Sequence, residues 1–89
     1  MQSRTLTVTN PTGLHARPAA LLVQTANKFE SQVTVYKSDG TGRKANAKSI
    51  LTVLSLGASK NTSVTIETSG VDELEALQAL VALVASFKE

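Results

Sequence analysis

The segment TGLHARPAALL, residues 12–22, holds the only histidine of the chain, next to side chains that are suited to phosphate chemistry. A proline is tolerated in the first turn of a helix, because the N–H that it lacks would have no partner there. Pro18 and the apolar residues that follow therefore predict that a helix begins within about two residues of His15.

The start of that helix is a natural anion site. Backbone N–H groups in the first turn have no partner inside the helix, and the helix dipole adds partial positive charge there. Arg17 contributes a planar set of donors that suits phosphate oxygens. The neutral imidazole of His15 carries a lone pair that can act as a nucleophile, so this segment could accept a phosphoryl group on a ring nitrogen. The alternative is the commoner case: His15 only caps the helix or faces solvent.

The composition predicts a single small domain over residues 1–89, with any chemistry at its surface. A domain of this size buries only about 60–65% of the surface of its unfolded chain, which disfavours a deep substrate cavity. The formal net charge is +2 and aromatic residues make up 3%. A nucleic-acid groove needs a basic stripe and aromatic platforms, so a small RNA-binding domain is disfavoured.

The chain contains no cysteine, which excludes disulfides and thiolate metal sites and fits a reducing compartment. With one histidine and no carboxylates clustered near it, we expect no metal and no cofactor. The first ten residues lack the apolar core of a signal peptide, and no apolar run is long enough to span a bilayer. We therefore expect a cytoplasmic protein that does not insert into a membrane.

Hydrophobic periodicity predicts an alternation of strands and helices. Period-two alternation predicts three strands and, less regularly, a short polar return strand: residues 4–9, 32–36, 62–68 and 43–47. Helical spacing predicts two helices: residues 16–29, and a long one after Asp72 with an apolar stripe from Leu74 to Phe87. The short apolar run of residues 50–56 could be a strand on periodicity alone, but the residues that flank it favour a short helix. The order βαββαβα, without a repeated βαβ unit, indicates an α+β fold with helices on one face of an antiparallel sheet.

Capping residues support the two later helices. Ser49 is a preferred N-cap residue directly before its apolar run, and Gly57 is well placed to end that helix. Asp72 followed by Glu75 has the pattern of a capping pair at the start of the last helix.

Two segments resemble the signatures of one bacterial family. TGLHARPAALL is similar to the active-site segment of the histidine-containing phosphocarrier proteins, HPr, of the phosphoenolpyruvate-dependent sugar phosphotransferase system. AKSILTVLSLGASKNTSVTI, residues 47–66, is similar to the family's second signature, around its regulatory serine. The resemblance covers essentially the whole chain. It implies an open-faced β-sandwich, a four-stranded antiparallel sheet with three helices on one face.

The resemblance implies a phosphoryl-group carrier and not an enzyme. His15 would accept the group on Nδ1 from the phosphohistidine of enzyme I and pass it to a histidine of a sugar-specific enzyme IIA. Arg17 would neutralise the phosphate, the N–H groups of Ala16 and Arg17 would complete its cradle, and Gly13 would let the loop present His15. A nitrogen-related phosphocarrier with a regulatory role shares the histidine motif and is the alternative.

Ser49 matches the family's regulatory serine. In bacteria with an HPr kinase/phosphorylase, phosphorylation there weakens carrier activity and creates a form that binds a catabolite-control transcription regulator. A phosphoserine adds about 1.5 to 2 negative charges beside an apolar docking surface, which disfavours docking. Bacteria without the kinase also carry this serine, so Ser49 alone does not show the regulation. A purely regulatory module phosphorylated only at Ser49 is disfavoured, because relatives of that kind lack the histidine.

The resemblance also implies an apolar surface that docks partners and lies close to His15. An exposed apolar patch near a reactive residue favours binding, although all the apolar residues of the short helix could instead be core. We assign Val53 and Leu56 to the buried side of that helix and expect a monomer that uses the other side for successive partners. The expected docking residues are Ala20, Ile50, Leu51 and Leu54.

Overall fold

The computed structural model describes all residues, 1–89. Its elements are β1 (Gln2–Thr7), α1 (Ala16–Ala26), β2 (Gln32–Lys37), β3 (Ala45–Asn46), α2 (Ile50–Ser55), β4 (Ser63–Ser69) and α3 (Glu73–Ser86). The predicted order of elements is confirmed, with β1 displaced by two residues toward the N-terminus. None of the helices combines the length and the apolar character that crossing a membrane requires.

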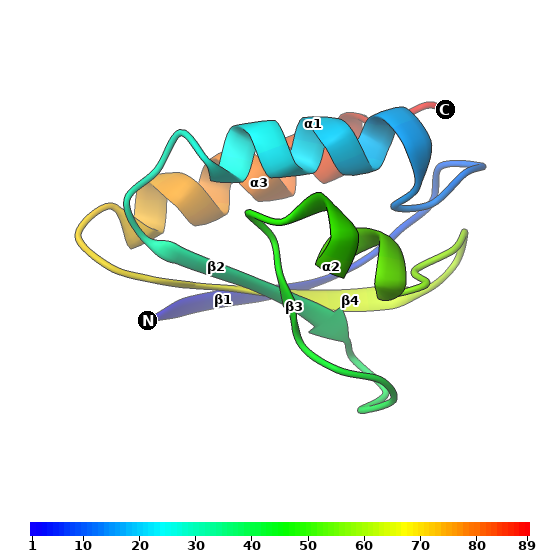
Figure 1. The fold of residues 1–89 in the computed structure, drawn as a ribbon, viewed down its shortest axis with the longest axis horizontal. Helices are drawn as coiled ribbons and strands as arrows, with labels where there is room; N and C mark the ends of the chain where they lie inside the picture. The colour runs from blue at the N-terminus through cyan, green and yellow to red at the C-terminus, as the bar shows by residue number, and fades with distance from the viewer.

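The strands form one antiparallel sheet in the order β1-β4-β2-β3. β4 pairs with both β1 and β2, so the last strand in sequence lies inside the sheet. In Figure 1 all three helices lie on one side of the sheet, with α1 alongside α3 and α2 packed against α1. The predicted open-faced β-sandwich is confirmed.

The core lies between the sheet and the helices. Alternation along the strands places Val33 and Val35 of β2, and Val64 and Ile66 of β4, on the inner face, where all four are buried. The helices contribute apolar residues at helical spacing. These are Ala19, Leu22 and Ala26 from α1, and Ala76, Leu77, Leu80 and Val84 from α3.

The end of α1 differs from the prediction. The helix stops at Ala26, whereas the apolar spacing suggested that it continues to Phe29. The side chain of the next residue, Asn27, donates hydrogen bonds to Val23 O at 2.9 Å and to Lys48 O at 3.1 Å. An asparagine that bonds the last turn and a neighbouring segment competes with continuation of the helix.

Neither predicted N-cap side chain makes a capping hydrogen bond. Ser49 and Asp72 occupy the N-cap positions of α2 and α3, but without a side-chain bond to the helix. The carboxylate of Asp72 instead accepts hydrogen bonds from the backbone N–H groups of Glu30 and Ser31 and from the Ser31 hydroxyl. The capping pair of Asp72 with Glu75 is therefore wrong, because contacts from a distant loop occupy the carboxylate.

Of the predictions for the end of α2 and for the first residue of the apolar stripe of α3, one is confirmed and the other is wrong. Gly57 follows the C-cap residue Leu56 and has φ +69°, so the predicted glycine stop is confirmed. Leu74 is 48% exposed, so it does not belong to the buried stripe of α3, although the sequence spacing included it.

Candidate functional site

His15 lies where the sequence placed it, at the first turn of α1. It occupies the N-cap position in an extended conformation, with φ −128° and ψ 168°, and its side chain makes no capping hydrogen bond. The residue is half-buried, so the imidazole is not packed inside the core. No group of three or more His, Cys, Asp or Glu side chains is arranged to hold a metal ion.

The residue after His15 has a strained backbone. Ala16 has φ +53°, in the left-handed region, which costs a residue with a side chain about 1–2 kcal/mol. The N–H of Ala19 donates a hydrogen bond to His15 O at 3.5 Å. The N–H groups of Ala16 and Arg17 have no backbone acceptor. Pro18 has no N–H. Two unpaired donors therefore follow His15, as an anion site requires.

The loop before His15 is held by the core. Leu14 is fully buried, and its N–H donates to Ala58 O at 2.8 Å. Gly13 has φ +64°, and a Cβ at this position would lie 2.3 Å from Ala58 O, so a larger residue requires the backbone to move. Sequence reasoning identified Gly13 but missed Leu14, whose only signal is that it is apolar within a polar loop.

A distant residue, Glu89, is bound to the same loop. Its backbone oxygen accepts hydrogen bonds from Asn10 Nδ2 at 2.7 Å, Thr12 Oγ1 at 2.6 Å and Thr12 N at 3.1 Å. Asn10 is only 3% exposed, and its Nδ2 also donates to Gly13 O at 2.9 Å. Sequence reasoning missed this contact, because Asn10 and Glu89 are 79 positions apart and no local pattern links them.

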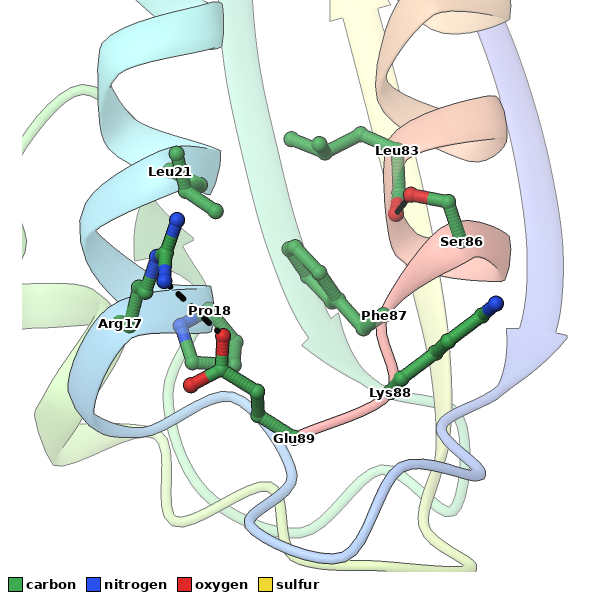
Figure 2. A pocket seen from close by; sticks show the side chains of 8 residues that line it. All are labelled: Arg17, Pro18, Leu21, Leu83, Ser86, Phe87, Lys88 and Glu89. Atoms are coloured by element: carbon green, nitrogen blue, oxygen red, sulfur yellow. Dashed lines mark hydrogen bonds and ion pairs between the residues drawn. The ribbon is translucent and has the colours of Figure 1, made fainter.

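Arg17 has a partner within the chain. Figure 2 shows its guanidinium directed toward Glu89, with Arg17 Nη1 3.4 Å from Glu89 Oε1. The two side chains are 72% and 57% exposed, and a surface ion pair of this kind contributes at most about 1 kcal/mol. The pair borders a cavity of about 220 Å³ between α1 and the end of α3. Its lining comprises Arg17, Pro18, Leu21, Leu83, Ser86, Phe87, Lys88 and Glu89.

The candidate docking residues divide as the sequence suggested. Val53 and Leu56 are buried, which confirms their assignment to the core. The exposed side of α2 carries Leu51, at 75%, and Ile50 and Leu54, each at 38%. Half-buried Ala20 lies on α1, which packs against α2. We refer to the residues that the sequence predicts to dock partners, Ala20, Ile50, Leu51 and Leu54, as the docking face.

Ser49 is half-buried directly before the docking face. Its backbone N–H donates to Asn46 O at 3.0 Å, and its carbonyl accepts from Val53 N at 3.2 Å and from Thr52 Oγ1 at 3.0 Å. Its hydroxyl is not used as a cap. A charged group added there would lie next to Ile50, at the edge of the docking face.

The chain matches the family model described as PTS HPr component phosphorylation site over residues 2–86. It is similar to the solved structure of HPr-C-His from Thermoanaerobacter tengcongensis, with 51% identity, a TM-score of 0.90, and coverage of 97% of this chain and 93% of that one. HPr from Bacillus anthracis is 41% identical, with a TM-score of 0.84 and coverage of 92% and 94%. The Bacillus subtilis protein Crh, described as a catabolite repression protein that forms a swapped dimer, is 46% identical, with a TM-score of 0.74 and coverage of 100% and 99%.

Proposed function

The chain belongs to the HPr family of phosphocarriers, and from that premise we propose that His15 carries a phosphoryl group between two other histidines. The donor is the phosphohistidine of enzyme I, and the acceptor is a histidine of a sugar-specific enzyme IIA. One observation carries this proposal: a half-buried imidazole at the N-cap of α1, followed by two backbone N–H groups without acceptors. This arrangement suits a group that must be held and then released.

The transfer is an in-line exchange at phosphorus. The lone pair of His15 Nδ1 forms the new P–N bond, and the bond to the donor nitrogen breaks with its electron pair returning to the donor ring. The His15 ring gives up the proton of its other nitrogen, and the leaving imidazole takes up one, so protons balance through solvent. Positioning and charge stabilisation account for such a reaction, with little covalent work left to the protein.

Arg17 and the first-turn amides stabilise the phosphoryl oxygens. The N–H groups of Ala16 and Arg17 are unpaired, and the Arg17 side chain is exposed enough to turn toward a phosphate on His15. The chain is then a covalent intermediate between enzymes and not itself a catalyst. Because no metal or cofactor is needed to hold the group, the proposal uses only side chains and backbone of this chain.

The docking face serves both partners in turn. Its exposed apolar residues lie on α2, which packs against the helix that begins at His15. A carrier must release each partner, so we expect a small interface, at the low end for specific complexes. We place this exchange in the cytoplasm, with residues 1–89 acting as one monomeric unit.

Ser49 is the second candidate phosphorylation site. Its hydroxyl makes no cap bond, and it precedes Ile50 of the docking face. A phosphate there would add charge at the edge of an apolar surface and weaken docking, while it would create a new surface for a catabolite-control regulator. An HPr kinase/phosphorylase would be the modifying enzyme.

Labelling from phosphoenolpyruvate tests the main proposal. Incubation with phosphoenolpyruvate and enzyme I should add one acid-labile phosphate to the chain and none to His15→Ala. Subsequent addition of an enzyme IIA should remove that phosphate from the labelled protein. Label that persists in His15→Ala would contradict the assignment of the site.

Two related functions are separated by the same assay. A carrier of the nitrogen-related system should be phosphorylated faster by that system's enzyme I than by the sugar-system enzyme I. The 46% identity to Crh makes a regulatory function the second candidate. His15 argues against it, since the resemblance implies that purely regulatory relatives lack this histidine.

A further inference from the structure

We propose that the free edge of β1, together with the groove between β1 and α3, binds an extended segment of another protein as a fifth strand of the sheet. The segment carries apolar residues at alternate positions and one carboxylate among them. This surface shares no residue with the site assigned to phosphoryl transfer or with the docking face, so the inference goes beyond the proposed function and does not depend on it.

The outer edge of β1 has unpaired backbone groups. β1 pairs only with β4, through consecutive antiparallel pairs without a bulge. Val8 N donates to Thr62 O at 2.8 Å, and hydrogen-bonded and non-hydrogen-bonded residues alternate along an antiparallel pair. The even-numbered residues of β1 therefore bond β4, whereas the N–H and C=O groups of Ser3, Thr5 and Thr7 are directed toward the free edge.

Side-chain contacts and strand length agree with an edge that is open to a further strand. Thr5 Oγ1 lies 2.8 Å from Thr65 Oγ1, and Thr7 Oγ1 lies 3.1 Å from Ser63 Oγ, as expected for the closer side chains of non-hydrogen-bonded pairs. Proteins protect edge strands by short length, charges, proline or bulges. The other edge strand, β3, has only 2 residues, whereas β1 has 6 residues with one charge and no proline. β1 is thus the less protected edge.

A groove beside this edge would receive side chains of the added strand. It has a volume of about 360 Å³, with Gln2 to Arg4 along one wall and apolar residues of α3 along the other. Those residues are Leu74, Leu77 and Val81, of which Leu74 is 48% exposed. Because side chains alternate across a strand, every second residue of the added segment would face α3 and enter the groove. Apolar residues at these positions would cover the exposed part of the α3 wall.

The charge of the groove specifies one further feature of the segment. Arg4 is the only charged residue that lines the groove, and it forms no salt bridge within the chain. A carboxylate on the residue opposite Arg4 would form a cross-strand ion pair. A second copy of this chain is a poorer occupant, because the helix-facing residues of its own β1 are Gln2, Arg4 and Leu6, which bring a second cation to the groove.

A capped peptide of six residues is the probe for this site. It has threonine at its first, third and fifth positions, valine at its second and sixth, and glutamate at its fourth. Paired antiparallel with β1, its threonines lie opposite Ser3, Thr5 and Thr7, and its glutamate lies opposite Arg4. Titration into isotope-labelled protein should shift the NMR amide signals of β1 and of the first turns of α3, and it should leave those of α2 unchanged. A peptide methylated at the threonine nitrogens loses its hydrogen bonds to β1 and should not bind.

A charge exchange tests the contact with Arg4. Arg4→Glu should weaken binding of the glutamate peptide by about fivefold, because an opposite-charge pair across the strands becomes a like-charge pair. A peptide with lysine in place of glutamate should bind Arg4→Glu more tightly than it binds the parent protein. Leu74→Asp should weaken binding of the glutamate peptide as well. Arg43→Glu is the matched control, since Arg43 is an exposed arginine that does not line the groove, and it should leave the affinity unchanged.

Three results would overturn the proposal. They are no shift of the β1 signals with the peptide, equal binding of the methylated peptide, and an unchanged affinity in Arg4→Glu. Dimerisation through β1 without the peptide would also overturn it, because the occupant would then be a second copy. Transfer from phospho-enzyme I should be unchanged in Arg4→Glu and Leu74→Asp, so failure of this inference is distinguishable from failure of the carrier function.

Discussion

Arg17 is the side chain whose partner must change during the proposed reaction. It is 72% exposed and paired only with the exposed Glu89, so its removal leaves no buried charge behind. Its planar guanidinium can bind two phosphate oxygens at once, whereas an ammonium group acts as a point charge. The side chain is therefore suited to transition-state stabilisation and contributes little to the fold.

Arg17→Ala should slow transfer from phospho-enzyme I and transfer to enzyme IIA by about 10- to 100-fold, because one charge-assisted contact to the phosphoryl oxygens is lost. The free energy of unfolding should change by less than about 0.5 kcal/mol, as is usual for an exposed side chain. Quench-flow labelling and urea unfolding measure the two effects. Arg17→Lys should recover only part of the rate, and a rate equal to that of the parent in Arg17→Ala would remove Arg17 from the mechanism.

Neighbours in sequence were predictable at this site, and distant partners were not. His15, Ala16 and Arg17 are consecutive, so the rules for helix starts bring them together without knowledge of the fold. The left-handed backbone of Ala16 has no local signal, because alanine does not favour φ +53°. The contact of Glu89 with Asn10 depends on the direction in which α3 ends, and hydrophobic spacing does not specify that direction.

Periodicity predicted the elements other than α2, which its flanking residues favoured, and capping rules predicted the ends of the helices less accurately. The apolar residues alternate with polar ones along β2 and β4 and form a stripe along α1, because one face of each element is buried in the core. A polar side chain at a helix end has several possible hydrogen-bond partners, and the tertiary structure determines which of them it bonds. Asn27 ends α1 early by bonding Lys48 O, and Asp72 bonds the α1–β2 loop instead of its own helix.

Asp72 therefore joins two elements, and its titration should affect stability. The Ser31 hydroxyl foremost, and then the N–H groups of Glu30 and Ser31, hold the pKa of the Asp72 carboxyl below its ordinary value of 3.8. A carboxyl with a lowered pKa in the folded state stabilises the fold when it is charged. Its contribution is complete above the unfolded-state pKa and is lost as the pH falls through the folded-state pKa.

Asp72→Asn should lower the thermal midpoint at pH 7, where the parent has its full set of charge-assisted bonds. The difference between parent and variant should shrink as the pH falls below about 4, because the parent then loses the charge as well. Thermal unfolding by circular dichroism between pH 7 and pH 2.5 measures both. Glu75→Gln serves as the control, and a gap between parent and Asp72→Asn that stays constant down to pH 2.5 would contradict the titration.

As a whole, the molecule separates its core from its reactive end. The core lies between the sheet and the helices, whereas His15 lies at the start of α1 and the exposed apolar residues of the docking face lie on α2, which packs against α1. Two other exposed apolar residues are Val71, in the turn between β4 and α3, and Leu74, in the first turn of α3. In Figure 1 the turn between β4 and α3 is at the opposite end of the molecule from the start of α1. Val71 and the docking face can therefore be tested independently of each other.

Leu51→Asp should impair both transfers by weakening docking. Leu51 is 75% exposed, so a charge there leaves the core intact, but it must lose its hydration when a partner covers α2. We expect the KM for this chain to rise by about tenfold with enzyme I and with enzyme IIA, which corresponds to about 1.4 kcal/mol of binding free energy. The kcat should be nearly unchanged, because His15 and Arg17 are untouched. Val71→Asp, at a residue that is 84% exposed, is the matched control and should leave both constants unchanged. A rise in KM for only one partner would show that the two enzymes do not share this face, since a common docking surface requires that both respond to the same charge.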